Sequence, residues 1–361
     1  MPQHSVTADG GPDEAVVVPV HLLTGFLGSG KTTLLTRLLD YYRETGRKAA
    51  VIMNELGDVN LDGQLVGDEV PMSELLGGCI CCTGRGDLGL EIHKLMEEHS
   101  PDVILIESTG AANPMEILDG ITEAAFYDRV ELGSVIAVVD GPGLIAQAAR
   151  GKGRTYKLMR DQIRCATRLI VNKSDRLAPD ELVLAEQTVR EWNPHAPLEA
   201  SVRCTVDPAS FDADAAYPAA VTAAHEPASS SAAEGQPPVG DYGEGGSSPV
   251  RGQGRHGRAP LHGSHGHVVA VTHYFSQPVD SVAFEAFLAA LPDNVYRAKG
   301  ILAFTDTAGG RFLFQYAYRE TDFLRITPQG KVNDVAVFIG ENLCEESLRR
   351  DLAELENPRV P

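Results

Sequence analysis

The sequence is poor in positive charge, in tryptophan and in long apolar runs. Its 361 residues include 31 Lys and Arg against 50 Asp and Glu, a formal net charge of -19, and a single Trp. A chain with this excess of acidic residues is a poor ligand for a phosphate backbone, so we expect no nucleic-acid binding. No apolar run is long enough to cross a bilayer, and the polar, acidic residues 1–15 do not resemble a secretory signal. We therefore expect a cytoplasmic protein that makes no membrane contact.

Cysteine is scarce too, and its distribution argues against a disulfide framework. Three of the six cysteines stand in Cys79-Ile80-Cys81-Cys82, whereas Cys165, Cys204 and Cys344 are isolated and are predicted to be small packing residues. Three thiols this close repel one another as thiolates unless a cation neutralises them, which favours a soft or borderline metal such as tetrahedral Zn²⁺. A redox dithiol and buried structural cysteines are the alternative interpretations.

Glycine, by contrast, is frequent, and three glycines stand in one turn, Gly25-Phe-Leu-Gly-Ser-Gly-Lys-Thr-Thr33, between the apolar run 16–23 and a segment with helical spacing of leucines. Strand, glycine turn and helix form the context of a phosphate-binding loop. In such a loop Lys31 supplies charge for the β- and γ-phosphates, and the Thr32 hydroxyl is a ligand for Mg²⁺. The predicted phosphate-binding residues are Gly25, Gly28, Ser29, Gly30, Lys31, Thr32 and Thr33.

A second motif, Asn172-Lys173-Ser174-Asp175, follows the apolar run 169–171. An aspartate in this loop can accept two hydrogen bonds from guanine N1 and N2, whereas adenine offers no matching pair of donors. We therefore predict GTP as the nucleotide. Asn172 is predicted to tie this loop to the phosphate loop, and the stem of Lys173 to lie along the base.

A third motif, Glu107-Ser108-Thr109-Gly110, ends the apolar run 103–106. A carboxylate here can hold Mg²⁺ or its water shell, and the Gly110 N–H can sense the γ-phosphate. The predicted catalytic residues are Lys31, Thr32 and Glu107. Because no glutamine is placed to orient the attacking water, we expect a slow intrinsic GTPase that a partner accelerates.

The arrangement of apolar runs predicts the fold class. The predicted strands are 16–23, 49–53, 103–106, 134–139 and 169–171, and segments 88–98 and 181–192 have helical spacing. Since these strands lack polar alternation, they suit a parallel sheet that is covered on both faces. We predict an α/β fold, with a doubly wound, mostly parallel sheet of the P-loop NTPase type and a smaller C-terminal α+β domain.

The predicted domain limits follow composition. Residues 1–15 are predicted to be a disordered tail and 16–207 the P-loop domain. Residues 208–266 have too few large apolar side chains to offset the entropy of ordering, so they are predicted to be a flexible linker. Four histidines near its end either capture metal or are an incidental scatter: His256, His262, His265 and His267. The last domain is predicted to span 267–361.

Within that last domain the periodicity predicts specific elements. They are a strand at 268–275, a helix at 279–291, a hairpin of 299–305 with 311–318, a strand at 335–339 and a helix at 345–355. The predicted inward side chains of the first helix are Val282, Phe284, Phe287, Leu288 and Leu291. The aromatic side chains of the second hairpin arm are predicted to belong to the core.

Taken together, these motifs resemble the CobW-type family of metallochaperone GTPases. The resemblance rests on residues 25–33, 54–62, 78–83, 107–110 and 172–175, and in the second domain on Arg297-Ala298-Lys299-Gly300-Ile301-Leu302 and on 338–343. It implies a GTPase that loads a transition metal, commonly Zn²⁺ and in some members Co²⁺ or Fe, into a client metalloprotein.

The resemblance also implies ligands for the metal. Cys79, Cys81 and Cys82 match the metal thiolates of the family, and Glu55 and Asp58 lie in a segment that resembles its switch loop. Glu55 is the implied candidate for the fourth ligand. GTP, Mg²⁺ and Zn²⁺ or Co²⁺ are the implied cofactors. The oligomeric state stays open, a homodimer included.

The predicted mechanism couples the two sites. GTP and Mg²⁺ order segments 55–62 and 107–110, and the turn 79–82 moves with them. Hydrolysis then changes metal affinity, so that the ion leaves to a docked client. Such coupling is reciprocal, so the metal must alter GTP affinity by the same factor. The alternatives are a GTP-regulated metal-binding or sensing module without delivery, and a P-loop small-molecule kinase, which leaves the cysteine motif unexplained.

Overall fold

The computed structural model describes residues 16–53, 70–74, 85–151, 153–213, 268–307, 309–317, 319–341 and 343–357. All of these residues belong to one compact unit. The predicted tail, the cysteine motif, Glu55 and Asp58, and the four linker histidines lie outside the described residues. No helix in the described part of the chain is both long and apolar enough to span a bilayer.

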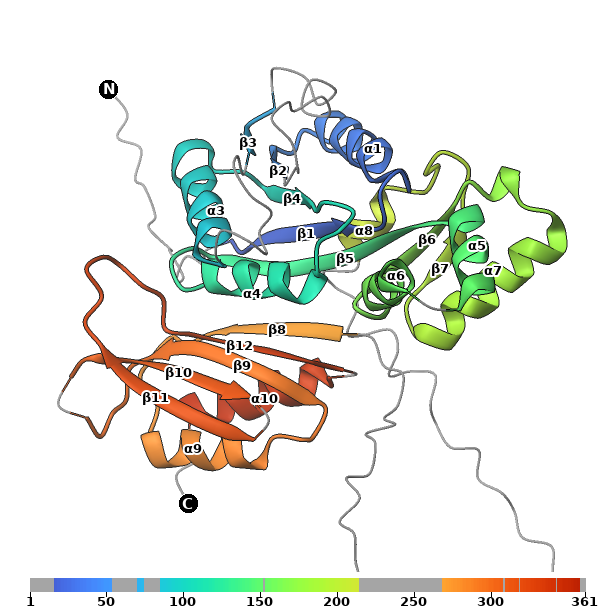
Figure 1. Ribbon diagram of the computed structural model, residues 1–361. Coiled ribbons are helices and arrows are strands. Elements are labelled where there is room, and N and C mark those ends of the chain that lie inside the picture. Colours follow the sequence, from blue (N-terminus) through green and yellow to red (C-terminus); the bar gives the residue numbers. More distant parts are fainter. Residues whose placement is uncertain are drawn as a thin grey trace, which may run out of the picture. The chain divides into compact units, whose positions relative to one another are not determined.

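A seven-stranded parallel sheet carries the first part of the chain (Figure 1). Its order is β3-β2-β4-β1-β5-β6-β7, and every pairing in it is parallel. The strands are β1 (Val18–Thr24), β2 (Ala49–Met53), β3 (Met72–Glu74), β4 (Val103–Glu107), β5 (Val130–Asp140), β6 (Arg168–Asn172) and β7 (Leu198–Ala200). Because the strands are parallel, the loops after β1, β4 and β6 open at the same edge of the sheet.

Helices cover both faces of this sheet. Successive side chains of a strand point to opposite faces. Leu23 of β1 accordingly packs in a cluster with α1 (Lys31–Glu44), while Leu22 packs in a cluster with α3 (Arg85–His99) and α4 (Pro114–Ala124). Farther along the sheet, the cluster of β5 and β6 includes α5 (Gly141–Arg150), α6 (Arg154–Arg164) and α7 (Pro179–Trp192).

The predicted fold class is confirmed, and all five predicted strands are present within a few residues of their predicted limits. The sequence analysis missed β3 and β7, the two edge strands, because three residues carry too little periodic signal to distinguish a strand from a loop.

The packed region also continues past the predicted start of the linker at residue 208. A short helix, α8 (Ala209–Ala213), follows Pro208, and the Phe211 ring is fully buried beside α1. The guanidinium of Arg168 lies 5.0 Å from the centre of that ring. A single buried aromatic side chain therefore packs this segment against α1 and Arg168, although its overall composition is typical of a linker.

A five-stranded antiparallel sheet of order β11-β10-β9-β12-β8 carries the second part of the chain. Its strands are β8 (Val268–Tyr274), β9 (Val295–Leu302), β10 (Arg311–Ala317), β11 (Glu320–Ile326) and β12 (Val335–Glu341). The predicted hairpin of β9 and β10 is confirmed. Strand β11 was not predicted, because its mostly exposed, charged residues lack the apolar signal of a buried strand.

Two helices, α9 (Ser281–Ala290) and α10 (Glu345–Glu356), cover one face of this sheet (Figure 1). The predicted inward position of Val282 is wrong, since its side chain is 70% exposed. Phe284 and Leu288 are the buried residues of α9, and Val282 precedes Phe284 by two residues, which places it about 200° around the helix. Cys344, predicted to be a packing residue, is exposed at the N-terminus of α10.

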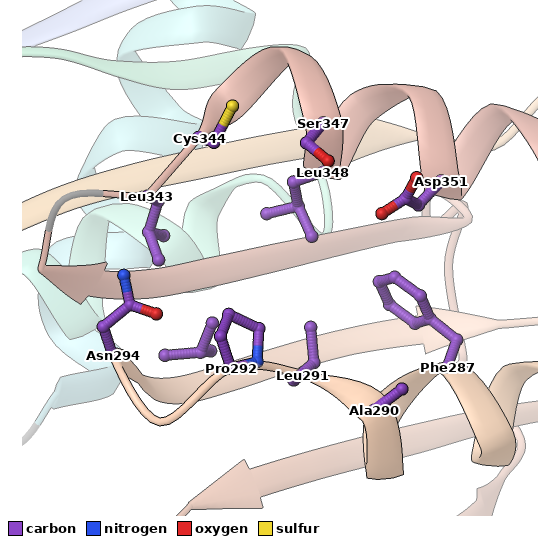
Figure 2. A pocket seen from close by; sticks show the side chains of 11 residues that line it. Phe287, Ala290, Leu291, Pro292, Asn294, Leu343, Cys344, Ser347, Leu348 and Asp351 are labelled. Atoms are coloured by element: carbon purple, nitrogen blue, oxygen red, sulfur yellow. The ribbon is translucent and has the colours of Figure 1, made fainter. Parts of the chain in front are cut away.

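A cavity of about 180 Å³ lies where α9 ends and α10 begins. Figure 2 shows Leu291, Pro292 and Leu348 around it, with Asn294 and Asp351 at its edges. None of the predicted site residues lines this cavity.

The other face of the five-stranded sheet shares a hydrophobic cluster with α4. Ile117 and Ile121 of α4 belong to the same cluster as Ile301, Val335 and Val337. Every residue of α4 except Met115, Glu116 and Glu123 is buried. Helix α4 is therefore enclosed between two sheets, which matters because it begins just after the Glu107–Gly110 segment.

Candidate functional site

The glycine turn after β1 has the backbone geometry that its sequence predicts. Gly25, Gly28 and Gly30 have positive φ angles of 140°, 72° and 116°. A Cβ on Gly25 would lie 2.2 Å from the Val138 carbonyl oxygen, and one on Gly30 would lie 2.4 Å from Asn172 Nδ2. At these two positions a side chain is excluded by both conformation and space.

Lys31 and Ser29 direct polar atoms into the interior of this turn. The buried Lys31 ammonium donates to the carbonyl oxygens of Gly25 (3.0 Å) and Phe26 (3.4 Å), so it lies inside the curve of the loop. Ser29 Oγ is buried without a hydrogen-bond partner among the described residues. A buried polar atom without a partner is rare in folded proteins and indicates a site where a ligand or water completes the network.

Thr32 lies beside Glu107, although 75 residues separate them in the sequence. The Thr32 hydroxyl donates to Glu107 Oε1 over 2.9 Å, and Glu107 is almost completely buried at the end of β4. Two adjacent oxygens of an octahedral Mg²⁺ shell, with ligand distances of about 2.1 Å, lie about 3 Å apart. Hydroxyl and carboxylate oxygens are also the ligands that Mg²⁺ prefers, so this pair fits the predicted metal.

Gly110 packs directly against the phosphate loop. A Cβ on Gly110 would lie 2.4 Å from the Leu27 backbone nitrogen, so only glycine permits this approach. The buried Gln162 of α6 donates to the Gly110 carbonyl oxygen over 3.3 Å. The sequence analysis missed Gln162, because a single glutamine in an amphipathic helix has no motif around it.

Asn172, at the end of β6, makes the predicted contact with the phosphate loop. Its Nδ2 donates to the Ser29 carbonyl oxygen over 2.7 Å, and its Oδ1 accepts from the Cys204 backbone N–H over 2.9 Å. Asn172 is 3% exposed, so both hydrogen bonds are shielded from water. One side chain thus joins three loops that are distant in sequence.

The next residues turn away from the core. Lys173 adopts a left-handed conformation (φ 62°), and its Nζ lies 2.9 Å from Asp140 Oδ2. Asp175 lies in the exposed 3₁₀ turn Ser174–Arg176, where its carboxylate is accessible. The structure therefore keeps Asp175 available for a ligand, while the Lys173 charge is balanced by Asp140.

Cys204 is the second residue that the sequence analysis missed at this site, because an isolated cysteine indicates only packing. Besides donating its N–H to Asn172, it lies with its Sγ 3.4 Å from the Gly30 carbonyl oxygen. Both Arg203 (φ 53°) and Cys204 (φ 51°) are left-handed, which is uncommon for residues other than glycine. Burial raises the pKa of the Cys204 thiol to about 12, so it stays protonated and packs as an uncharged group.

The structure does not describe the predicted transition-metal site. Cys79, Cys81, Cys82 and Glu55 lie outside the described residues. In the described ranges, no group of three or more His, Cys, Asp and Glu side chains is placed to hold a metal ion.

The fold and the site define a protein of the P-loop class. It has central parallel strands, a glycine turn that encloses a buried lysine, and a carboxylate at the end of the neighbouring strand. The chain belongs to the CobW/HypB/UreG family. Residues 19–199 match the nucleotide-binding domain of that family, and residues 268–356 match the cobalamin synthesis protein cobW C-terminal domain.

Curated relatives share about half of their length with this chain. Zinc chaperone YeiR of Escherichia coli is 35% identical over 173 residues, which cover 48% of this chain and 50% of the relative. Zinc-regulated GTPase metalloprotein activator 1 of Dictyostelium discoideum is 31% identical over 224 residues, covering 52% and 46%. Zinc chaperone CobW of Pseudomonas aeruginosa is 31% identical over 193 residues, covering 46% and 51%.

Among solved structures, Zn(II)-bound YjiA GTPase from E. coli is similar to this chain at 24% identity. The alignment covers 94% of this chain and 99% of that one, with a TM-score of 0.44.

Proposed function

We propose that this protein binds and hydrolyses GTP and uses the nucleotide cycle to bind a transition metal, with zinc the favoured ion, and to transfer it to a client protein. The observation that carries the nucleotide part is the buried network around Asn172, which joins the Asn-Lys-x-Asp loop to the phosphate loop. The zinc part is supported by the names of relatives that share the family, two of which are zinc chaperones.

In this proposal the phosphate loop binds the triphosphate through backbone N–H groups and Lys31. The ammonium that now donates to the Gly25 and Phe26 carbonyl oxygens turns toward the β- and γ-phosphates. Asp175 accepts hydrogen bonds from guanine, which selects GTP over ATP. Gly110 lies against Leu27 of the phosphate loop, so its N–H is near the place where a terminal phosphate would lie.

Thr32 and Glu107 would hold Mg²⁺, which supplies charge neutralisation on the phosphate oxygens when bound. Hydrolysis needs a water molecule to attack the γ-phosphorus while the bond to the β–γ bridging oxygen breaks, releasing GDP and inorganic phosphate. The described residues include no side chain that we assign to orient this water. A slow intrinsic rate, raised by a partner, is therefore part of the proposal.

The transferred metal is a substrate in this proposal, and Cys79, Cys81 and Cys82 are its ligands, with Glu55 the candidate for the fourth. Three thiolates favour Zn²⁺ over harder divalent ions, and the same ligands can also bind Co²⁺ or Fe. A ligand set with one exchangeable position is suited to transfer, because an incoming ligand of the client can replace the fourth ligand first.

The nucleotide part is tested by equilibrium binding of fluorescent GTP and ATP analogues to the intact protein. We expect GTP to bind with an affinity at least about a hundredfold greater than that of ATP, since ATP leaves the Asp175 acceptors unpaired. Equal affinities for the two nucleotides would contradict the assignment of Asp175.

The metal part is tested by competition titration of Zn²⁺ against a chromophoric chelator, with and without a non-hydrolysable GTP analogue. Serine replacement of Cys79, Cys81 and Cys82 should abolish tight binding, whereas the matched variant Cys344→Ser, at the exposed cysteine that precedes α10, should bind as the wild type does. Transfer to an apo client protein should be faster with GTP than with the analogue. Equal transfer rates would favour a sensing module without delivery.

A further inference from the structure

The Arg-Ala-Lys-Gly segment of β9 has no role in the proposed nucleotide chemistry, yet its two cations contact the nucleotide-binding part of the chain. Arg297 Nη1 lies 2.6 Å from Asp119 Oδ2, and Lys299 Nζ lies 2.5 Å from Glu123 Oε1. Asp119 and Glu123 both lie on α4. The Asp119 and Lys299 side chains are only 7% and 11% exposed, so removal of either partner leaves a charge shielded from water.

The spacing of the two pairs matches the geometry of the two elements. Four residues of a helix rise about 6 Å, and two residues of a strand rise about 6.8 Å. Arg297 and Lys299 are two apart on one face of β9, and Asp119 and Glu123 are four apart on one side of α4. Two ion pairs with this match fix both the position and the rotation of α4, which a single pair does not.

Helix α4 is in turn connected to Gly110 by a short, hydrogen-bonded segment. The Ala112 N–H donates to the Thr109 carbonyl oxygen (3.1 Å), and Asn113 caps the helix by accepting from the Met115 N–H (3.1 Å). This short segment therefore cannot absorb a movement of α4. A displacement of the helix moves Gly110 relative to Leu27 of the phosphate loop.

A second connection reaches Gly110 through α6. Gln162 donates to the Gly110 carbonyl oxygen, and Arg164, two residues later on the same helix, lies 3.2 Å from Glu341 of β12. The five-stranded sheet thus contacts both helices that hold Gly110, one through β9 and the other through β12.

We propose that Arg297 and Lys299 are positioning residues for the nucleotide site: by holding α4 they keep Gly110 against the phosphate loop and so set the preference for GTP over GDP. The proposal rests on the proposed function, in which Gly110 lies at the terminal phosphate. It follows that a protein bound to the five-stranded sheet can change nucleotide preference without touching the nucleotide, and nucleotide exchange can change the affinity for that protein equally.

The test compares the affinities of GDP and a non-hydrolysable GTP analogue for the full-length wild type and for the double variant Arg297→Ala/Lys299→Ala. We expect the analogue-to-GDP affinity ratio to fall by about fivefold or more, the low end of typical coupling factors, with GDP affinity within about twofold of the wild type. The matched control is Arg311→Ala, which removes the bidentate ion pair with Asp334 inside the C-terminal sheet. It should lower thermal stability and leave the ratio unchanged.

A charge exchange keeps the test decisive if the double variant does not fold. Lys299→Glu should lower the ratio, and adding Glu123→Lys should restore it, because the pair is re-formed with opposite polarity. An unchanged ratio in the Arg297 and Lys299 variants, with a lower melting temperature, would mean that these residues are only structural and would overturn the proposal. If the wild type itself binds neither nucleotide, the proposed function fails instead.

Discussion

Replacement of Asn172 by alanine separates the role of this side chain in folding from its role in nucleotide binding. The change removes the donor to the Ser29 carbonyl oxygen and the acceptor of the Cys204 N–H, both in buried surroundings. Each buried group left without a partner costs about 1–3 kcal/mol, so we expect a loss of at least about 2 kcal/mol. For a domain of this size that lowers the melting temperature by roughly 4–8 °C.

The same change should weaken GTP binding, because the Asp175 loop is no longer held to the phosphate loop. The two lost hydrogen bonds contribute about 0.5–1.5 kcal/mol each, so we expect an affinity roughly tenfold lower. Thermal unfolding with and without nucleotide measures this directly. At a ligand concentration of about 100 times the wild-type Kd, bound nucleotide stabilises the wild type by about 2.7 kcal/mol and the variant by about 1.4 kcal/mol.

Asn193 supplies the matched control. It is also fully buried, donates to the carbonyl oxygens of Ile163 and Ala166 (2.8 Å each), and accepts from the Ala196 N–H (3.1 Å), so none of these hydrogen bonds goes to the phosphate loop. Asn193→Ala should lower stability by a similar amount and keep the full nucleotide-dependent stabilisation. The reasoning is refuted if Asn172→Ala loses stability but gains as much from GTP as Asn193→Ala does.

Three further outcomes are expected. Asp175→Asn should lower GTP affinity by about a hundredfold and raise the affinity for xanthosine triphosphate, measured by competition, because the amide N–H can donate to the xanthine oxygen that replaces the guanine amino group. Cys204→Gly loses the packing of a fully buried side chain but places a residue there that accepts the left-handed backbone, so it should cost less stability in urea unfolding than Cys204→Val, which should cost more than about 2 kcal/mol; similar losses in both would contradict the backbone argument. Burial lowers the pKa of His273 below its ordinary 6.5 despite Glu356 at 3.2 Å, so the unfolded chain takes up the proton first as pH falls. Wild-type urea midpoints should therefore fall more than those of His273→Gln between about pH 7.5 and 5.5, and parallel curves would count against this assignment.

The local motifs and the strands that precede them could be read from the sequence because both depend on neighbouring residues. A phosphate loop requires glycines at defined positions between a strand and a helix, and the structure has that loop after β1 with positive φ angles at Gly25, Gly28 and Gly30. The parallel sheet follows from apolar runs without polar alternation. The roles of Lys31, Thr32, Glu107 and Asp175 in binding nucleotide and Mg²⁺ stay predictions.

Errors arose where the outcome depends on what a side chain meets in three dimensions. Val282 has the composition of a core residue, but the start of α9 at Ser281 rotates it to solvent. Phe211 lies in a stretch of linker composition and is buried by α1 and Arg168. Cys204 carries no local signal, and only the folded loop brings its N–H to Asn172.

The sequence by itself determined which loops have the pattern of phosphate- and guanine-binding loops, because glycine conformations, strand ends and helix starts are set by residues close together in the chain. Only the tertiary structure decided that the C-terminal sheet holds α4 through Arg297 and Lys299. Those pairs join residues 176 or more positions apart, and their partners, Asp119 and Glu123, resemble ordinary surface acids in the sequence. Sequence patterns report local periodicity, whereas contacts at this separation depend on how two completed sheets pack.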